Sequence, residues 1–496
     1  MVIYVFDGQK DKLGLLNEID NEHSINESSG EDILITPKII NTFLRNHGLN
    51  KELRAKHLFA FGIGTVVTGF YMQWNLGLGM TGPYGVLAAM LVVFWFYLTF
   101  FSVLARFSVN YPYAGGPYAY ARQGLGSFGG YLAGAATTLQ FVCASSLVLI
   151  IVRKYLSLIY PELPGDYLAL GFFALLITIH ITSVWFSGIV QIFLTGSALS
   201  GIVLFFIGTY HTVDVNNYFT TTPVVFGGLW GILGALPAVM WFYLGMEGIT
   251  MSAEETRKPQ HDLPLSLMSG LGTAFLLSLG VLYFGIVSVN WSHLKTVDFP
   301  LVYILSQVQR QDEVLLATFA LINIVAFFAS LHGLINGYSR QAYALSRAGY
   351  LPNFLSRMKT KHQIPFLAVV VPGLFSITIS FIGSFQTVAV LTLFSAMLMY
   401  LLVIISYLRI RKPKPEIFYR SSVLRHPFVL MVSLGLVIIG QISLIYQYLA
   451  SVWIILMIYF GVVLYYYFWA GKNVRNEAPE ENAAISTQNK VRIEVK

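Results

Sequence analysis

The residues with the clearest potential for chemistry lie between Leu236 and Pro264, in the stretch LPAVMWFYLGMEGITMSAEETRKPQHDLP. Inside this stretch, Glu247 stands in an apolar segment with Gly245 and Gly248 close on either side. A carboxyl group at membrane depth is costly, and it marks a functional site that faces a cavity or the interior of a helix bundle. Glycines weaken a helix at the same point. We therefore expect two half-helices joined by a short unwound segment, where bare backbone and a carboxyl group can bind a small polar species.

A second segment with the features of an interrupted helix is the apolar run at 58–80, LFAFGIGTVVTGFYMQWNLGLGM. Its glycines also fit a helix-packing face built from small residues. The polar run QWN near its end is harder to place in lipid. We expect a break near Thr68 and Gly69, followed by an outer half-helix that lines a wet cavity.

A third polar feature lies in the apolar run at 314–339. It includes His332, a titratable ring near the middle of a segment long enough to cross a bilayer. A neutral histidine bonded to a backbone carbonyl is the alternative to a functional role. The other polar residues of this cluster are Asn323, Ser330, Asn336 and Ser339.

The composition indicates the elements that must position these residues. Hydrophobic residues make up 56% of the 496 residues and charged residues 11%, and the mean hydropathy is +0.66. These values predict an all-α integral membrane protein. Each of twelve apolar runs approaches the roughly 20 residues that a spanning helix needs. The runs lie at about 58–80, 84–106, 128–152, 167–186, 188–210, 226–252, 266–289, 314–339, 366–384, 386–408, 428–449 and 452–470.

The charges and the cysteine content exclude several classes of function. Cys143 is the sole cysteine of the sequence, so neither a disulfide framework nor a thiolate metal cluster is available. We expect no metal and no cofactor. Basic residues gather at the termini and in the connections after spans 2, 6, 8 and 10, which accounts for the net charge of +7 without a nucleic-acid partner. This asymmetry predicts a protein of the cytoplasmic membrane with both termini in the cytoplasm.

The two interrupted spans are the first and the sixth, and each begins a block of five spans. Interruptions at corresponding positions of two halves predict an inverted-repeat transporter with its site at the midplane. The expected parts are a polar, disordered tail at 1–56, a transporter domain at 57–470 with repeats at 58–210 and 226–409 and added helices at 428–470, and a disordered tail at 471–496.

Four local patterns resemble those of the amino acid, polyamine and organocation (APC) transporter superfamily, over about residues 55–470. They are a P-x-A-G-G-x-Y-x-Y loop after span 2, a segment similar to W-x-F-I-G-x-E in span 6, the A-E-E…P…D-x-P exit from that span, and the loop after span 8. The matching positions are Pro112, Ala114, Gly115, Gly116, Tyr118 and Tyr120; Trp241 to Glu247; Ala253, Glu254, Glu255, Pro259, Asp262 and Pro264; and Tyr338 to Pro352.

Within the superfamily the chain is most similar to ethanolamine permeases, on the runs Gly69 to Asn75, Tyr243 to Gly248 and Ser330 to Gln341. The long acidic amino tail and the loop Glu416 to Pro427 depart from the family pattern.

This resemblance implies a leucine-transporter-type fold, in which the breaks of spans 1 and 6 face each other at mid-membrane. Carbonyls at half-helix C-termini would then attract an ammonium group, and N–H groups at half-helix N-termini would hold a carboxylate. Aromatic residues could add a cation–π wall, and the resemblance makes Trp241 a lid over the substrate. The candidate substrate-binding residues are Val67, Thr68, Gly69, Trp74, Trp241, Tyr243, Leu244 and Gly245, with Glu247 and His332 as candidates for coupling or gating.

The function that we expect is transport of a small amine or amino acid by alternating access, with ethanolamine as the first candidate substrate. The β-branched Val67 before the Thr-Gly pair leaves less bare backbone for a carboxylate, which favours an amine without an acid group. An amino acid or polyamine permease or antiporter is the alternative. A membrane-embedded enzyme is disfavoured because the intramembrane acids are scattered. A sensor or channel is disfavoured because no soluble domain and no ring of pore-lining charges is evident.

The coupling ion stays open at this point. A proton carried by Glu247 and the absence of ion coupling both fit the sequence. A sodium site would need span-1 carbonyls together with span-8 hydroxyls, which Ser330 and Ser339 could supply. A proton scheme that uses a lysine of span 5 is excluded, since residues 188–210 contain no lysine.

Overall fold

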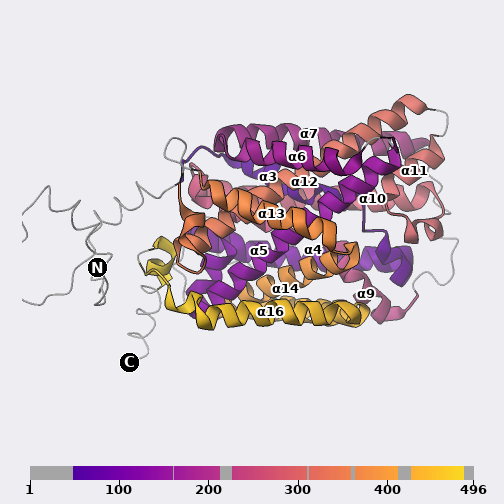
Figure 1. The fold of residues 1–496 in the computed structure, drawn as a ribbon. Helices are drawn as coiled ribbons and strands as arrows, with labels where there is room; N and C mark the ends of the chain where they lie inside the picture. Colours follow the sequence, from indigo (N-terminus) through magenta and orange to yellow (C-terminus); the bar gives the residue numbers. More distant parts are fainter. Residues whose placement is uncertain are drawn as a thin grey trace, which may run out of the picture. The chain divides into compact units, whose positions relative to one another are not determined.

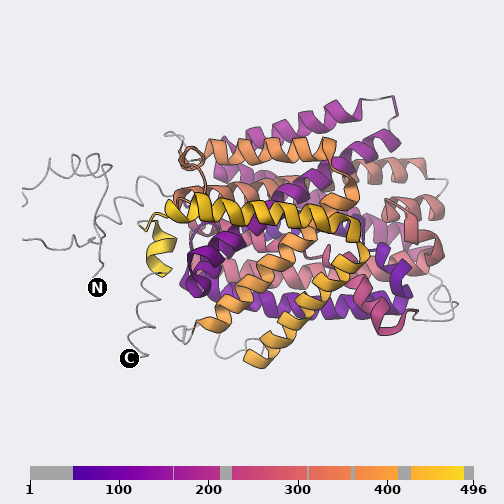
Figure 2. The same ribbon diagram turned by 60° about the horizontal axis from the view of Figure 1, so that its bottom comes forward.

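The structure, a computed structural model, is helical throughout the residues that it describes, which are 49–159, 161–162, 164–212, 226–309, 312–358, 364–410, 426–476 and 478–484. These residues belong to one compact unit (Figures 1 and 2). The acidic amino tail and most of the loop Glu416 to Pro427 lie outside the described residues. The helices are α3 (Ala55–Tyr71), α4 (Leu76–Asn110), α5 (Pro117–Ile159), α6 (Gly165–His180), α7 (Val184–Thr209), η1 (Tyr210–Thr212), α9 (Gly228–Met240), η2 (Met246–Glu255), α10 (Pro259–Ser288), η3 (Trp291–Thr296), α11 (Pro300–Val308), α12 (Glu313–Arg347), η4 (Asn353–Ser356), α13 (Phe366–Ile382), α14 (Phe385–Arg409), α15 (Pro427–Gln447), α16 (Leu449–Phe468) and η6 (Ala470–Lys472).

Eight helices of the described chain are long and apolar enough to cross a membrane. The apolar helices α6, α9 and α13 are shorter, at 10–17 residues each. A helix stands at every position where a span was expected, but the count that meets the length and hydropathy criteria is eight rather than twelve. The chain is therefore a multi-pass membrane protein.

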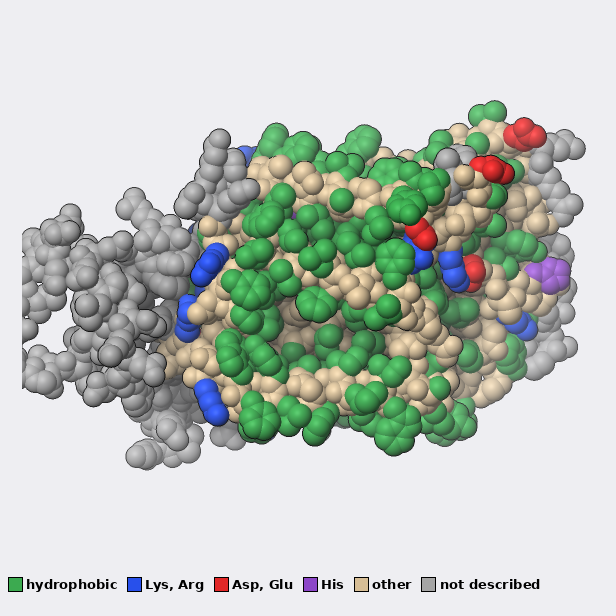
Figure 3. Space-filling view, in the orientation of Figure 1, with side chains coloured by type: hydrophobic (Ala, Val, Ile, Leu, Met, Phe, Trp, Pro, Cys, Tyr) green, Lys and Arg blue, Asp and Glu red, His purple; other side chains and the backbone are tan. Residues whose placement is uncertain are grey.

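The outer surface has the character that lipid contact requires. Large apolar side chains are exposed on several helices, among them Leu276, Phe375 and Trp453 at 68%, 61% and 72%. Figure 3 shows hydrophobic side chains covering the face between the two ends of the bundle, with charged side chains confined to the ends. Figures 1 and 2 show α16 along the outside, where it buries little beyond Ser451 and Ile455.

The first interruption lies four residues later than the sequence indicated. Thr68 and Gly69 belong to α3, which continues to Tyr71. The unwound part is 72–75, where Gln73 has a φ of +78°. Thr68 stays helical because its carbonyl accepts a hydrogen bond from the N–H of Met72 at 3.1 Å, which closes the last turn of the helix.

The second interruption is present where it was expected. The helix α9 ends at Met240, the unwound residues are 241–245, and the 3-10 helix η2 begins at Met246. Gly245 has a φ of +99°, a conformation that side chains with a Cβ atom rarely adopt. A glycine next to the carboxyl group is therefore what lets the chain turn at this point.

Three other sequence expectations need correction. The P-x-A-G-G-x-Y-x-Y segment after span 2, Pro112 to Tyr120, was expected to be a loop, but α5 already begins at Pro117 and is only kinked at Gly126, where φ is +76°. Residues 49–56 were assigned to a disordered tail, yet Leu53 is fully buried and pairs with Thr256 through an isolated bridge. The tail after Trp469 is likewise packed at 478–484 rather than disordered.

Candidate functional site

A small cavity of about 30 Å³ lies beside the two interruptions. Among the described residues, its lining contains no charged side chain. Such a volume holds about two water molecules, so a solute of four or more heavy atoms needs side-chain or helix movement to enter. The lining residues come from α3, the unwound part after it, α5, the 241–245 segment and α12: Thr65, Val66, Thr68, Gly69, Met72, Gln73, Gln140, Ala144, Leu147, Val148, Ile151, Trp241, Leu244, Gly245 and Leu334.

The two interrupted segments meet backbone to backbone at this cavity. A Cβ atom added to Gly69 would lie 2.0 Å from the carbonyl oxygen of Trp241 and 2.6 Å from its carbonyl carbon. Gly245 makes a similar close approach, because a Cβ atom there would lie 2.8 Å from Cγ2 of Thr65. The helices α3 and α9 both end at this point, and the C-terminal end of a helix carries partial negative charge. The cavity is therefore suited to a positively charged group.

Five of the eight residues expected to bind substrate line the cavity, namely Thr68, Gly69, Trp241, Leu244 and Gly245. The other three lie elsewhere.

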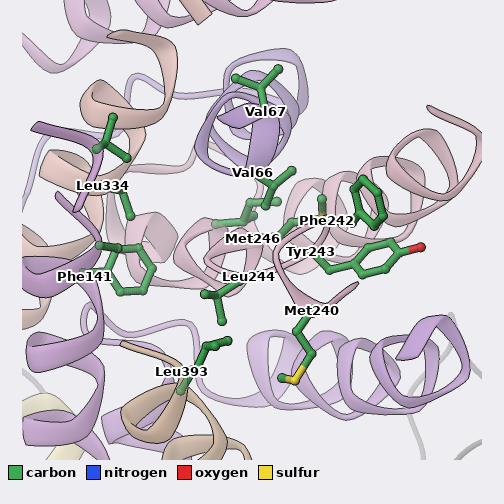
Figure 4. Close-up of a cluster of buried hydrophobic side chains, with 14 of the residues drawn as sticks. Val66, Val67, Phe141, Met240, Phe242, Tyr243, Leu244, Met246, Leu334 and Leu393 are labelled. Carbon is green, nitrogen blue, oxygen red and sulfur yellow. The ribbon is translucent and has the colours of Figure 1, made fainter. Parts of the chain in front are cut away.

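Val67 is fully buried and does not line the cavity; Figure 4 shows it on the side of α3 that faces away from Leu244, while Val66 points toward it. Trp74 is buried in packing against Gly285, and the Tyr243 hydroxyl lies 3.2 Å from that of Ser278. The argument that Val67 narrows the site thus loses its structural basis.

Glu247 is fully buried and lies one side chain away from the cavity. Gln140, which lines the cavity, donates a short hydrogen bond from Nε2 to Oε1 of Glu247. The N–H of Gly245 donates to Oε2 at 3.2 Å, and the hydroxyl of Tyr400 lies 3.4 Å from both carboxyl oxygens. The Tyr400 hydroxyl is in turn 3.1 Å from that of Tyr97. Glu247 is thus connected to the cavity, to the unwound segment and to α14.

His332 belongs to a separate polar cluster between α12, α6 and α7. Its Nδ1 lies 2.6 Å from Oε1 of Gln191, and its ring centroid is 4.1 Å from that of His180. Nδ1 is the donor in this bond, because the Gln191 amide nitrogen already donates elsewhere. The carboxyl of Glu247 has its hydrogen-bond partners on other elements, so the structure does not bring these two coupling candidates together.

Carbonyls of α3 and α12 near this cluster accept hydrogen bonds from protein donors. Nε2 of Gln191 donates to the carbonyls of Ala60 at 3.2 Å and Ala329 at 3.1 Å. The Ser330 hydroxyl donates to the carbonyl of Gly64 at 3.0 Å and accepts from the Thr68 hydroxyl at 2.6 Å. Span-1 carbonyls and a span-8 hydroxyl do meet here, and the Gln191 amide connects the two helices through the carbonyls of Ala60 and Ala329.

Sequence reasoning assigned no role to Gln140 and passed over Tyr400. An amide inside an apolar span was the available signal for Gln140, because a buried amide needs partners. Tyr400 gave no signal, because tyrosine is common in this chain. The apolar lining residues Leu147, Val148 and Ile151 could not be told from core residues without the fold.

Comparison with known proteins places these features in context. The model of a family described as amino acid permease matches residues 53–468. An uncharacterized transporter of Rhizobium meliloti (strain 1021) is 26% identical over 341 residues, which are 65% of this chain and 70% of the relative. A probable threonine/serine transporter of Bacillus subtilis (strain 168) is 22% identical over 407 residues, or 78% and 85% of the two chains. A branched-chain amino acid permease of the same organism is 23% identical over 391 residues, or 74% and 83%.

Proposed function

The chain belongs to the amino acid permease family of the APC superfamily, and from this premise we propose that it is a secondary transporter for a small amine-bearing solute, with small neutral amino acids as the first candidates. The observation that carries this proposal is the meeting of the Gly69 and Trp241 backbones at a cavity without charged side chains. The ends of α3 and α9 would bind the amino group of the solute. The relatives with assigned substrates are described as transporters of amino acids, which supports this class over an enzyme.

The cavity lining favours a small neutral solute over a polycation. A polyamine would need carboxylates for its second ammonium group, and the lining offers none among the described residues. Leu147, Val148 and Leu244 supply apolar surface for a short side chain. Ethanolamine, expected from the local sequence resemblance, is the second candidate, because the additional argument from Val67 is lost: this residue points away from the cavity.

Transport requires the cavity to open alternately to the two sides of the membrane. The end of the bundle where α3 begins is held by ion pairs whose side chains are at most 12% exposed. Arg340 lies 2.9 Å from Glu255, and Arg347 lies 2.6 Å from Glu254. Since basic residues gather at this end in the sequence, it is assigned to the cytoplasm. With this assignment, we propose that the arrangement is closed on the cytoplasmic side.

For coupling, Glu247 is the proton-binding candidate. Its hydrogen bond with Gln140 links it to the cavity, so that solute binding and protonation can influence each other. The proposal does not include sodium coupling at the α3–α12 contact. The carbonyls of Ala60 and Ala329 there already accept hydrogen bonds from the side-chain amide of Gln191. His332 stays a candidate for gating through α7.

Counterflow in proteoliposomes tests the proposed function. Vesicles loaded with unlabelled solute should accumulate the same solute in radiolabelled form without ATP or an imposed ion gradient. Threonine, serine, valine and leucine are compared with ethanolamine. Accumulation of at least one neutral amino acid, with competition from others, is the expected result. Uptake of ethanolamine alone would identify the second candidate, and no uptake of any of these solutes by the folded protein would refute the proposal.

A further inference from the structure

The C-terminal segment Ala478–Ala484 is packed into the same end of the bundle that the Arg–Glu pairs close. Glu480 and Glu481 are both 0% exposed. The chain shortly before this segment is also anchored to the bundle, because the N–H of Arg475 donates to the carbonyl of Ala348 at 2.9 Å. Figures 1 and 2 show this short yellow helix at the end of the bundle where α5 begins. Two glutamates from a chain end do not become fully buried without specific partners.

Those partners lie on different elements of the transporter. Nε of Arg122, in α5, is 2.5 Å from Oε2 of Glu481. The hydroxyls of Tyr118 and Tyr350 donate to Oε1 of the same glutamate at 2.6 Å and 3.0 Å. Glu481 is therefore held by an arginine and two tyrosines, from α5 and from the connection after α12.

Glu480 bonds to α12 instead. Nη2 of Arg347, near the end of that helix, lies 2.9 Å from Oε2 of Glu480. Arg347 also bonds to Glu254, at the end of η2. The segment thus connects α5, α12 and the half-helix that follows the second interruption.

Alternating access requires some of these elements to separate at this end, since otherwise the cavity cannot open to it. Every separation of α5 from α12 would break a bond to Glu480 or to Glu481. The geometry points to a latch: the C-terminal segment 478–484 docks through Glu481 on Arg122 and through Glu480 on Arg347, holds this end of the transporter closed, and must leave before the end can open. This inference rests on the proposed transport function.

The balance of charges distinguishes the two glutamates. Three buried arginines (Arg122, Arg340 and Arg347) pair with four carboxyl groups, of which Glu255, Glu480 and Glu481 are fully buried and Glu254 is 12% exposed, so one carboxylate of this set is in excess. Glu480 is that group, because its arginine is shared with Glu254. Burial, together with the neighbouring carboxylate of Glu254, raises the pKa of Glu480 to about 7 against the opposing effect of Arg347. The titratable and charged groups that face Glu480 are Arg347 and Tyr343 from α12, Glu254 from η2, and Tyr113 and Tyr118 from the segment around the start of α5.

The sign of the pH effect follows from this shift. The pKa of the Glu480 carboxyl rises from its ordinary 4.5 in the free segment to about 7 in the docked one. A raised carboxyl pKa means that docking takes up a proton between these two values. Docking is therefore strongest below about pH 4.5, weakens by up to about tenfold per pH unit as the pH rises toward 7, and no longer changes above about pH 7.

A reporter cysteine that needs no substrate tests the latch. Ser252 of η2 is buried between the cavity and the latch, so Ser252→Cys is made in a Cys143→Ser background and placed in lipid nanodiscs. The rate of its reaction with a water-soluble thiol reagent is measured between pH 5 and pH 8.5 and divided by the rate of a small free thiol at the same pH, because the reactive thiolate fraction itself rises with pH. In this background the normalised rate should increase up to about pH 7 and level off above it.

The two glutamates should then behave differently. Glu481→Gln leaves Arg122 without its carboxylate and should accelerate labelling by about tenfold, within the range of a coupling between distant sites. Glu480→Gln resembles the protonated form, so the segment should stay docked and the pH dependence of the normalised rate should disappear. Glu313→Gln, an exposed acid at the other end of α12, is the matched control and should change nothing.

A second variant covers the case in which Glu481→Gln does not fold. A protease site inserted between the exposed residues Arg475 and Asn476 is cut after the folded protein is in nanodiscs. Cutting removes the tether that keeps the segment at high local concentration, so the segment should dissociate and labelling should accelerate. A segment that leaves without any change in labelling overturns the proposal, and so does a segment that remains bound after dilution at pH 8.5. Accelerated labelling without transport of any amine or amino acid would leave the latch intact and refute the proposed function instead.

Discussion

The contact between the two interrupted helices makes Gly69→Ala the sharpest perturbation of the site. The added Cβ atom would lie 2.0 Å from the carbonyl oxygen of Trp241, whereas Cβ contacts under 3.0 Å are essentially never seen. The neighbour is backbone, so one of the two segments must move by about 1 Å. Such overpacking lowers the free energy of unfolding by about 1–3 kcal/mol. The higher helix propensity of alanine over glycine, roughly 1 kcal/mol, partly offsets this decrease.

The expected outcome is a loss of transport that exceeds the loss of stability. A misplacement of about 1 Å at a binding site can reduce turnover by about 100-fold, while the free energy of unfolding should fall by about 2 kcal/mol or less. Counterflow rates and thermal unfolding in detergent measure the two effects. Gly272→Ala is the matched control, because this glycine of α10 is exposed and a Cβ atom there meets nothing within 4 Å. If Gly69→Ala transported within about twofold of the wild-type rate, the two backbones would not form the site.

Three further substitutions test other parts of the account. Trp241→Leu should raise the apparent KM by about 2- to 30-fold through loss of a cation–π contact worth ~0.5–2 kcal/mol. Trp95→Leu, at an exposed position on α4, should leave KM unchanged. Equal effects of the two substitutions would mean that Trp241 only packs. Glu247→Gln should flatten the pH dependence of uptake and retain solute binding, and a variant with the wild-type pH profile would place the proton elsewhere. Arg340→Ala removes one partner of a fully buried ion pair, so the free energy of unfolding, measured by thermal unfolding, should fall by about 3–5 kcal/mol. A decrease below about 1 kcal/mol would show that this end is not closed by the pair.

The sequence predicted the family and the second interruption because both depend on local patterns. The Gly245–Glu247 arrangement places a weak helix and a costly carboxyl group at one point, and only an unwound segment accommodates both. The first interruption was misplaced because glycine density was weighed above polarity. Gly69 serves a close approach between helices within α3, and the chain unwinds later, at Gln73.

The partners of each site residue could not be predicted, because they come from helices distant in the sequence. Gln140 reaches Glu247 across 107 residues, and Arg122 reaches Glu481 across 359. No period or motif within one helix encodes such a pairing. The packed C-terminal segment was expected to be disordered because its composition is polar, and its order comes from arginines contributed by α5 and α12.

The central claim is that the solute binds where the two interrupted helices meet. A structure of the protein with the transported solute bound tests this claim most directly. The account predicts the solute between Gly69 and Trp241, with its amino group within hydrogen-bonding distance of carbonyls at the ends of α3 and α9. A solute bound instead at the polar cluster of His332 and Gln191, or on the surface of the bundle, would contradict it.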